Sequence, residues 1–334
     1  GTTSSNTDGT ITSTVQVNRQ GGFSVLTWTG TGAQGTIGHG LDDTPDFIIS
    51  KRLDSTNNWS VYHKDLGLSH TSYPNWLYLN LSAAEQNSGT PANHPYYQAP
   101  SSSLIYQNTG TSENTNVNSG QYVTYCFAEK TGFSKFGSYT GNGSSNGPII
   151  NTGFEPAFLI IKRTDTDPTS GGNTTWLLYD NKRNPSNPRN TRLWADNSAA
   201  EISLSPQYNI DFLSNGFQLK DGSSGFAMNT SGGNYIYMAF ASDPSAAPVL
   251  ADSFDTTLYT GGGTSQAVTG LGFKPSLLWI KSRNNTSNST FSHSLFDSMR
   301  TNGYRLISNS TAAQNDYSAY MTGFNTDGFS LVGD

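Results

Sequence analysis

Hydrophobic residues along this chain occur in short runs that are separated by turns rich in Gly, Asn, Ser and Pro. Some runs alternate with polar residues, as in Phe23–Thr29 (FSVLTWT), and others are mostly apolar, as in Phe47–Leu53 (FIISKRL). Alternation is typical of strands with one buried face, and we expect Phe47–Leu53 to be buried at its start and solvated at its end. No stretch sustains the period of an amphipathic helix, so the pattern predicts an all-β protein.

The apolar runs recur in a fixed order with a domain-sized period. In each copy a Pro precedes the run and a Lys follows six residues after that Pro, so the copies lie 111 and then 119 residues apart. The three pairs are Pro45/Lys51, Pro156/Lys162 and Pro275/Lys281. Such a period is too long for one coil of a solenoid and predicts tandem domains that each fold independently. We expect the three prolines to enter equivalent strands.

Further landmarks flank these runs in every copy or in two of them. A Ser-Ala-Ala-Glu motif begins at Ser82 and Ser198 and becomes Thr-Ala-Ala-Gln at Thr311. Because it matches a capping box, we expect it to start a single helical turn. A late apolar strand, Tyr122–Ala128 in the first copy and Tyr235–Ala241 in the second, has no counterpart in the third.

The chain therefore divides into a connector and three repeats, which we interpret as tandem antiparallel β-sandwich domains of the jelly-roll or lectin-like kind. The connector includes one alternating segment, Thr10–Val17. The predicted boundaries are 1–21 for the connector, 22–130 for repeat 1, 131–244 for repeat 2 and 245–334 for repeat 3, which lacks its closing strand.

The missing strand of repeat 3 should leave backbone groups and an apolar face uncovered, which is costly. We expect the slot to be filled either by further residues of the same polypeptide or by an extended segment of a neighbouring chain. Thr10–Val17 is the only spare strand in the sequence. If the chain is whole, we expect that segment to fill a neighbour's third repeat and to build a head-to-tail fibre.

Aromatic residues fall into repeated and unrepeated positions. The pairs Trp59/Tyr62 and Trp176/Tyr179 recur, and become His293/Phe296 in repeat 3. Because they lie inside predicted strands, we interpret them as core residues rather than as ligand platforms. The better candidates for stacking against sugars lie outside the repeated positions, although edge packing also explains them: Trp76, Tyr96, Tyr97 and Trp194.

Composition excludes several functional classes. The net charge of −6 comes without any basic stripe, which argues against nucleic acid as a partner. No apolar run is long enough to span a bilayer, so we expect no membrane insertion. The single cysteine, Cys126, lies in an apolar strand and should be a small buried hydrophobic residue. With no disulfides available, each repeat must be stabilised by its buried core.

The sequence contains no recognisable catalytic or metal-binding pattern. The five histidines occupy non-equivalent positions without the spacing of metal ligands. His63 and His70 with Asp65 could form a site, but a solvated loop explains them better. A glycoside hydrolase would need a convergent pair of carboxylates, and no such pair is evident. We therefore expect no metal, no cofactor and no enzymatic activity.

Taken together, several motifs resemble a tandem repeat module of tailed-bacteriophage virion proteins, especially those of tail-fibre-like proteins. They are GFS…YTGNGS, the strand ending in IIKR, W-x-x-Y, SAAE, the late NGF strand and YIYMAFA. The resemblance covers almost the whole chain and implies a β-sandwich module in a virion or extracellular fibre. It also implies copies of itself or other virion proteins as partners, and possible contact with a host-surface glycan. The leading hypothesis is thus a non-enzymatic structural and attachment protein, and the alternative is a carbohydrate-binding or filament-forming protein of an extracellular surface.

Overall fold

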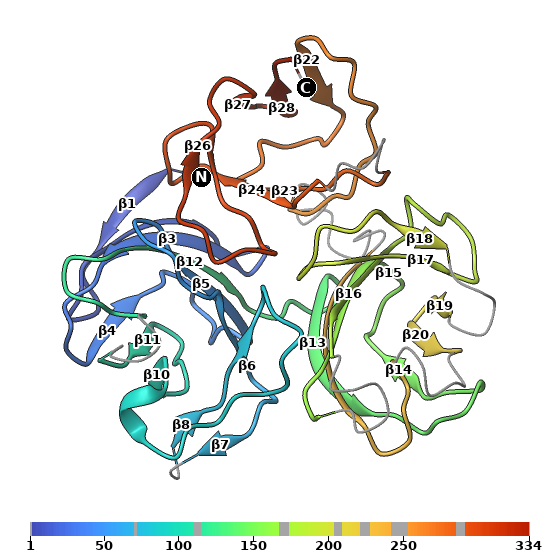
Figure 1. Cartoon of the computed structure of the whole chain (residues 1–334), viewed down its shortest axis with the longest axis horizontal. Helices are drawn as coiled ribbons and strands as arrows, with labels where there is room; N and C mark the ends of the chain where they lie inside the picture. Colours follow the sequence, from blue (N-terminus) through green and yellow to red (C-terminus); the bar gives the residue numbers. More distant parts are fainter. Residues whose placement is uncertain are drawn as a thin grey trace.

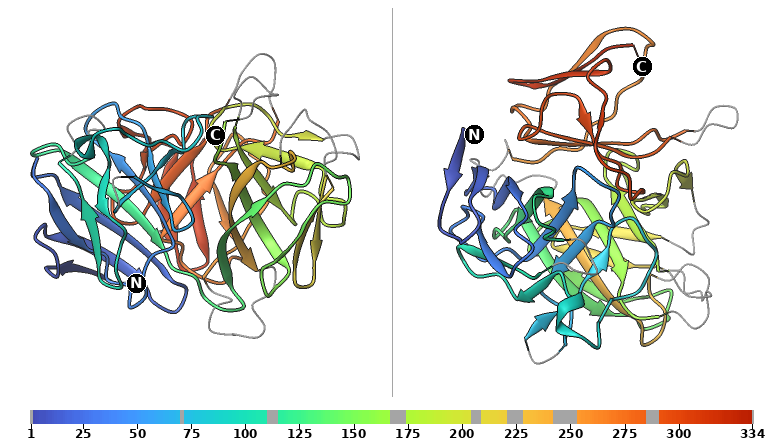
Figure 2. Two further views of the ribbon diagram at one scale, coloured as in Figure 1. Left: turned by 90° about the horizontal axis from the view of Figure 1, so that it is seen from below. Right: turned by 60° about the vertical axis from the view of Figure 1, so that its left-hand side comes forward.

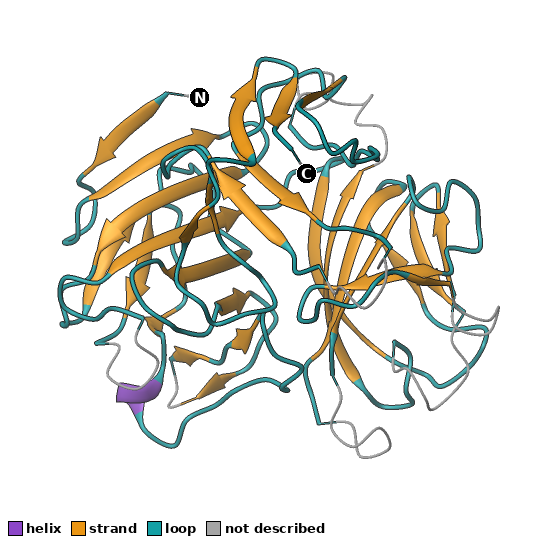
Figure 3. Ribbon diagram, turned by 45° about the horizontal axis from the view of Figure 1, so that its top comes forward, coloured by secondary structure: helices purple, strands orange, loops and turns teal. Residues whose placement is uncertain are grey.

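The computed structural model of the chain is all-β, as predicted, and its described residues include one 3-10 turn, η1 (Pro91–Asn93). Every pair of named strands is antiparallel, and the strands form sandwiches of larger and smaller sheets, grouped into three lobes around a common centre (Figure 1). Figure 3 shows strands in every lobe, joined by loops. The structure describes residues 2–69, 72–109, 115–166, 174–203, 209–220, 228–241, 253–284 and 291–333.

The first repeat and the connector before it form one lobe. Its strands are β1 (Thr3–Asn6), β2 (Ser13–Asn18), β3 (Phe23–Thr29), β4 (Gly35–Gly38), β5 (Phe47–Arg52), β6 (Ser60–His63), β7 (Leu68–Ser69), β8 (Tyr73–Pro74), β9 (Leu77–Tyr78), β10 (Tyr96–Gln98), β11 (Leu104–Gln107) and β12 (Gln121–Phe127). The large sheet has the order β1-β2-β3-β12-β5-β6-β9, and the small sheet that faces it has the order β10-β11-β4. The short strands β7 and β8 pair separately.

The second repeat has the same plan. Its strands are β13 (Ser134–Thr140), β14 (Ile149–Asn151), β15 (Pro156–Arg163), β16 (Trp176–Asp180), β17 (Thr191–Trp194), β18 (Ile202–Ser203), β19 (Ile210–Leu213), β20 (Gly216–Leu219) and β21 (Asn234–Ala241). The large sheet runs β13-β21-β15-β16-β17-β18 and the small sheet β14-β20-β19. Strand for strand, this repeats the order β3-β12-β5-β6-β9 and β4-β11-β10 of the first repeat.

The third repeat keeps part of this plan. Its strands are β22 (Gln266–Thr269), β23 (Leu277–Ile280), β24 (Ser294–Asp297), β25 (Tyr304–Arg305), β26 (Asn315–Asp316), β27 (Met321–Asn325) and β28 (Gly328–Leu331). The small sheet, β22-β28-β27, is complete, whereas β23-β24 and β25-β26 are separate pairs. The predicted equivalence of the prolines is confirmed, because Pro156 begins β15 while Pro45 and Pro275 each stand two residues before β5 and β23.

Both faces of each large sheet are buried, which explains its nearly continuous apolar runs. In repeat 1, Ile48 and Tyr62 face the small sheet, whereas Ile49 and Val61 face the centre of the molecule. The expectation that Phe47–Leu53 is solvated at its end is wrong. Lys51 and Leu53 are buried there because the neighbouring repeat covers this end of the strand.

One hydrophobic core joins all three repeats. The cluster at the centre contains Val123 and Tyr125 from repeat 1, Met238 from repeat 2, and Leu295 and Leu306 from repeat 3. Three further clusters fill the individual sandwiches. The repeats therefore do not form separate beads along a line: each large sheet completes its burial only against the other two repeats. The views in Figure 2 show the same close grouping of the three lobes.

Equivalent hydrogen bonds close the three repeats into a ring. The indole N–H of Trp59 donates to the carbonyl of Ile307 at 3.0 Å, and that of Trp176 donates to Tyr78 at 2.9 Å. His293, the third member of this repeated position, has its Nε2 2.7 Å from the carbonyl of Trp194. Each acceptor lies four residues before the Ser-Ala-Ala-Glu motif or its variant. Repeat 1 thus contacts repeat 3, repeat 2 contacts repeat 1, and repeat 3 contacts repeat 2.

The Ser-Ala-Ala-Glu motif forms part of the same joints and starts no helix, so the predicted helical turn is wrong. Its last residue in each repeat donates its backbone N–H to the next repeat, at a carbonyl two residues after the repeated lysine. These bonds are Glu85 to Thr164 at 2.6 Å, Glu201 to Arg283 at 2.8 Å and Gln314 to Leu53 at 3.0 Å. The motif is extended because its N–H groups find partners in the neighbouring repeat rather than in a helical turn.

The connector strand is not spare. β2 pairs with β3 along its whole length, and β1 pairs with β2 at the outer edge of the first large sheet. Ile11 and Val15 are buried in the sandwich of repeat 1, and Val17 packs against it. The expectation that Thr10–Val17 fills the third repeat of a neighbour is therefore wrong for this structure, since both its backbone edge and its apolar face are already used.

The buried tryptophans provide a test of this shared architecture. Trp59 and Trp176 are 0% and 1% exposed, which confirms that they are core residues. We expect Trp176→Ala to lower the free energy of unfolding by about 3–5 kcal/mol, the usual cost of truncating a core aromatic residue. Trp176→Phe keeps most of the packing but removes the hydrogen bond to Tyr78, and should cost about 1–3 kcal/mol. Urea denaturation of both variants measures these values.

Because the core is shared, the loss should extend beyond repeat 2. We expect hydrogen exchange of the backbone amides of β5 and β12 in repeat 1 to accelerate in Trp176→Ala along with those of β15. Unchanged protection of repeat 1, with repeat 2 unfolding alone, would show that the repeats are independent domains after all.

Candidate functional site

The candidate site is a cavity of about 370 Å³ at the joint between repeats 1 and 2. Both repeats contribute polar side chains, and repeat 2 adds one large aromatic ring. The lining residues are Asn80, Leu81, Ser82, Thr175, Trp194, Asp196 and Asn197. A concave site that combines an aromatic face with a few polar groups is typical of small-molecule binding.

Trp194 is held in place by both its backbone and its ring. It ends β17, which pairs with β16 through the partners Leu177 and Trp194. Its carbonyl contacts the ring of His293, which anchors this residue to repeat 3. The guanidinium of Arg192 lies 5.2 Å from the centre of its ring, and Trp194 is half-buried and lines the cavity. A tryptophan positioned in this way offers a rigid apolar surface at little entropic cost.

Asp196 occupies a position that is structural in all three repeats. Its Oδ1 accepts the backbone N–H of Trp176 at 3.3 Å. The equivalent Asn80 and Asn309 accept the N–H of the residues that match Trp176, at 2.9 Å and 3.0 Å. Only repeat 2 has a carboxylate at this position, and burial raises the pKa of Asp196 against the opposing effect of Lys162. The carboxylate therefore adds a strong acceptor that the other two joints lack.

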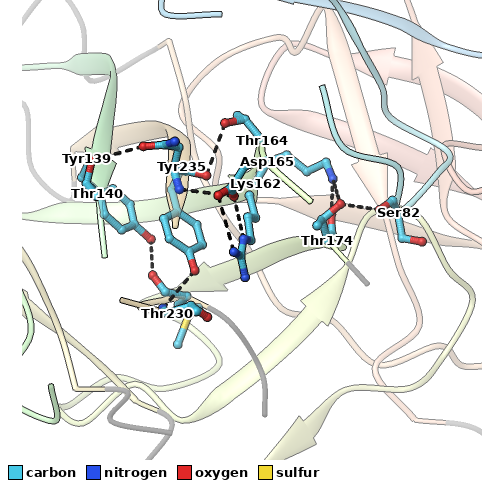
Figure 4. A network of polar contacts seen from close by, with 12 residues as sticks. Ser82, Tyr139, Thr140, Lys162, Thr164, Asp165, Thr174, Thr230 and Tyr235 are labelled. Carbon is cyan, nitrogen blue, oxygen red and sulfur yellow. Dashed lines mark hydrogen bonds and ion pairs between the residues drawn. The ribbon is translucent and has the colours of Figure 1, made fainter. Parts of the chain in front are cut away.

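Lys162 lies beside the cavity and is fully buried. Its Nζ donates to the carbonyl of Ala83 at 2.7 Å and to the hydroxyl of Thr174 at 2.8 Å, and also to the carbonyl of Thr174. Thr174 in turn donates to the carbonyl of Ser82 in repeat 1. Figure 4 shows Lys162 and Thr174 reaching toward Ser82, with a second polar group around Asp165 and Tyr235 on the other side.

Burial lowers the pKa of Lys162 to about 7, although Asp196 opposes the shift. A lysine with so low a pKa can indicate a catalytic site. The repeats argue against that interpretation here. Burial also lowers the pKa of Lys51 and of Lys281 to about 8. Since all three equivalent lysines behave alike and Lys162 uses its donors on backbone and threonine oxygens, we assign it a structural role in the joint.

What distinguishes this joint from the others is a set of side chains that differ between repeats. Trp194 corresponds to Tyr78 and Ile307, and Asp196 corresponds to asparagines. An aromatic ring beside a carboxylate and amide groups can bind a sugar, because the ring covers the apolar face of a pyranose while the polar groups receive its hydroxyls. The arrangement supports binding of a small polar ligand with one apolar face.

The structure gives different surroundings to the four aromatic residues that the sequence offered as candidates for stacking against sugars. Trp76 and Tyr96 are 3% and 2% exposed, so the expectation that they stack against sugars is wrong: both complete the packing of repeat 1. Tyr97 is half-buried against Tyr106, with ring centroids 5.6 Å apart, on the small sheet of repeat 1. Only Trp194 lines the cavity, and the other three do not join it there.

The segment that contains Tyr96 and Tyr97 is also more ordered than a surface loop. Residues 86–103 lie between β9 and β11. They include η1 and β10, and β10 pairs with β11 as β19 pairs with β20. The burial of Tyr96 follows from this pairing, because alternate residues of β10 face the sandwich interior.

His63 and Asp65, which the sequence offered as part of a possible site, contribute to the packing between repeats and to a local turn. His63 is fully buried, its Nε2 lies 3.3 Å from the carbonyl of Tyr237 in repeat 2, and its Nδ1 accepts the N–H of Asp65. Burial lowers its pKa to about 4. His63 is therefore not part of a solvated loop, and His70 lies outside the described residues. Within the described ranges, no three His, Cys, Asp or Glu side chains are grouped so that they could hold a metal ion.

Sequence reasoning found Trp194 but missed Asp196, Asn197 and Asn80. The available signal was the divergence of one repeat from the others at aligned positions, such as Asp196 against Asn80 and Asn309. That divergence could identify the residues as unusual, but it could not show that they lie close together. Asn80 and Trp194 belong to different repeats and line the same cavity only because the two repeats pack at this joint.

Comparison with known proteins identifies the family. The chain belongs to the family described as "Domain of unknown function (DUF7483)", whose model matches residues 1–244 and 250–334. No curated protein and no solved structure matches the chain significantly. In the part of the chain that the structure describes, no helix is long and apolar enough to cross a membrane.

The buried lysines predict how stability depends on pH. The folded Lys162 releases its proton near pH 7, whereas an unfolded lysine keeps it up to about pH 10.5. Between these values the unfolded state binds more protons, so the free energy of unfolding should rise with pH, by up to about 1.4 kcal/mol per pH unit for one titrating group. Urea denaturation from pH 7 to pH 10 should show this rise in the natural chain and a shallower one in Lys162→Met. Equal slopes in the two proteins would contradict the burial of a titrating lysine.

Proposed function

For this member of the DUF7483 family we propose a non-enzymatic structural and attachment role: a rigid three-repeat unit of a fibre on the surface of a phage virion, which contacts the host surface. The observation that carries the proposal is the closed ring of joints. Buried Trp59, Trp176 and His293 each bond to the neighbouring repeat, and the repeated positions are therefore used for internal cohesion.

A rigid unit of this kind is suited to displaying variable side chains. The residues that differ between repeats, such as Trp194 and Asp196, lie at a joint that opens to solvent. The exposed residues Lys182 and Pro185–Pro188 also differ from the residues at the equivalent place in the other repeats. Because a stable scaffold tolerates changes in such segments, surface recognition can vary without loss of the fold. The resemblance of the sequence motifs to virion repeat modules supports the same role.

Imaging tests this proposal directly. Antibodies raised against the chain should label an appendage or the surface of intact virions in immuno-electron microscopy. Labelling of lysed host cells, with virions unlabelled, would overturn it.

A second candidate function is carbohydrate binding at the joint of repeats 1 and 2, favoured by the cavity that Trp194 and Asp196 line. The ring provides an apolar platform and the carboxylate a strong acceptor. A carbohydrate-binding protein of another extracellular surface could use the same geometry. The labelling of virions described above distinguishes that protein from a virion protein.

We expect the chain to bind a subset of bacterial surface polysaccharides on a glycan array, and Trp194→Ala to weaken that binding about tenfold or more, since the loss of one stacking contact of about 1.4 kcal/mol has that effect. Tyr97→Ala serves as the matched control, because Tyr97 is half-buried but lies away from the cavity. If the array shows no bound glycan, or if both variants lose binding equally, the proposed sugar site is wrong. The result of virion labelling does not depend on that outcome.

A further inference from the structure

Asp196 has a half-buried carboxylate that forms no ion pair with any described residue. Burial raises the pKa of Asp196, because water stabilises its negative charge less well there than at the surface. Comparable carboxylates in this chain each pair with an arginine: Asp180 with Arg183, Glu201 with Arg283 and Asp297 with Arg300. A positive charge brought to Asp196 from outside would supply the partner that these three already have.

The neighbouring lysine does not fill this place. Lys162 opposes the rise in the pKa of Asp196 through its charge, but its Nζ donates hydrogen bonds to oxygens of Ala83 and Thr174. Burial lowers the pKa of Lys162 to about 7, so above that pH most of the molecules carry a neutral lysine here. The carboxylate of Asp196 then lacks a counter-charge among the described residues.

The cavity offers this carboxylate to a ligand beside an aromatic ring. Asp196 is the only ionisable side chain among the described residues that line the cavity, and Trp194 lines it as well. Arg192, whose guanidinium lies 5.2 Å from the centre of the Trp194 ring, is 1% exposed and is not among the lining residues. The exposed residues Ser82 and Asn197 add a hydroxyl and an amide. A ligand therefore meets one negative group, one aromatic surface and neutral polar groups.

The fold itself does not require a carboxylate at this position. Asn80 and Asn309, at the equivalent places in repeats 1 and 3, accept the same backbone hydrogen bond at 2.9 Å and 3.0 Å. Asp196 accepts it at 3.3 Å, so an amide oxygen makes this contact at least as well. A buried charge also costs more desolvation than an amide does. What the carboxylate adds is a contact that the repeated structure does not make.

We propose that the cavity between repeats 1 and 2 selects a sugar that carries a primary amine, with its pyranose face on Trp194 and its ammonium group on Asp196. This inference rests on the proposed sugar site and adds to it the charge of the ligand. An ammonium group donates three hydrogen bonds and forms a charge-assisted one with a carboxylate. A sugar acid places a like charge beside Asp196, so the cavity rejects it.

The first experiment compares four probes on the full natural chain near pH 7: glucosamine, glucose, glucuronate and ethanolamine. Ligand-observed NMR titrations give their dissociation constants. We expect glucosamine to bind about tenfold to a hundredfold more tightly than glucose, because a hydrogen bond to a charged group adds to the contact with the ring. Glucuronate should bind more weakly than glucose. Ethanolamine has the amine without the pyranose ring, and should bind more weakly than glucosamine.

The outcomes separate this inference from the sugar site on which it rests. Equal affinities for the three sugars, or tightest binding of glucuronate, would overturn the selection for an amine and leave the sugar site in place. Ethanolamine that binds as tightly as glucosamine would show a site for ammonium alone, and would also overturn the proposal. If none of the three sugars binds, both the sugar site and its charge selection are wrong.

Asp196→Asn tests the role of the carboxylate. This variant places in repeat 2 the residue that repeats 1 and 3 already have, so it should fold, and its melting temperature checks that. We expect the ratio of glucosamine affinity to glucose affinity to fall to about one. Asp316→Asn is the matched control, because it removes the same charge from an exposed position of repeat 3 that does not line the cavity. An unchanged ratio in Asp196→Asn, or an equal fall in both variants, would contradict the proposal.

Trp194→Ala separates the role of the ring from that of the charge. We expect it to weaken the binding of glucose and of glucosamine by a similar factor, so that their affinity ratio stays above one while both affinities fall. A ratio that falls to one in Trp194→Ala would show that the amine binds to the aromatic face rather than to the carboxylate, and would overturn the assignment to Asp196. If either variant fails to fold, the comparison of the four probes on the natural chain decides the proposal.

Discussion

The structure depends on a hydrogen bond that each repeat makes to its neighbour from a buried aromatic side chain. Trp59, Trp176 and His293 occupy one repeated position, and each reaches a carbonyl four residues before the Ser-Ala-Ala-Glu motif of the adjacent repeat. A buried ring N–H usually has a hydrogen-bond acceptor, and at this repeated position the partner carbonyl lies in another repeat in all three cases. The bond therefore imposes both the burial of the aromatic ring and the closure of the ring of repeats.

The shared core follows from this closure. The large sheets of the repeats turn one face toward their own small sheets and the other toward the centre, where residues such as Val123, Met238 and Leu306 meet. A sheet that is buried on both faces has no solvated side, and the lysine near the end of β5 or β15 is a charged residue that such a sheet must accommodate. Lys51 and Lys162 are accommodated because carbonyl groups of the neighbouring repeat accept hydrogen bonds from their Nζ atoms. Their lowered pKa values record the cost of that burial.

Repetition also separates structural from functional residues in this protein. A side chain that makes the same contact in three repeats, such as Asn80, Asp196 or Asn309 at the backbone of the aromatic residue, is explained by the fold. What remains is the difference between copies: the carboxylate of Asp196 and the ring of Trp194 at one joint. The proposed rigid scaffold rests on the repeated joints, whereas the proposed sugar site rests on these departures from the repeat.

The sequence alone determined the class of fold, the number and order of the repeats and the burial of Trp59 and Trp176, because alternation, turn residues and recurrent spacing are local properties of the chain. It could not determine that the repeats share one core, that the Ser-Ala-Ala-Glu motif is extended, or that β2 belongs to repeat 1. Each of these depends on which surfaces meet, and a motif such as Ser82–Glu85 satisfies a local helical pattern until another repeat offers its N–H groups better partners. Only the tertiary structure brought Asn80 to Trp194, since residues far apart in sequence share a site when packing places them together.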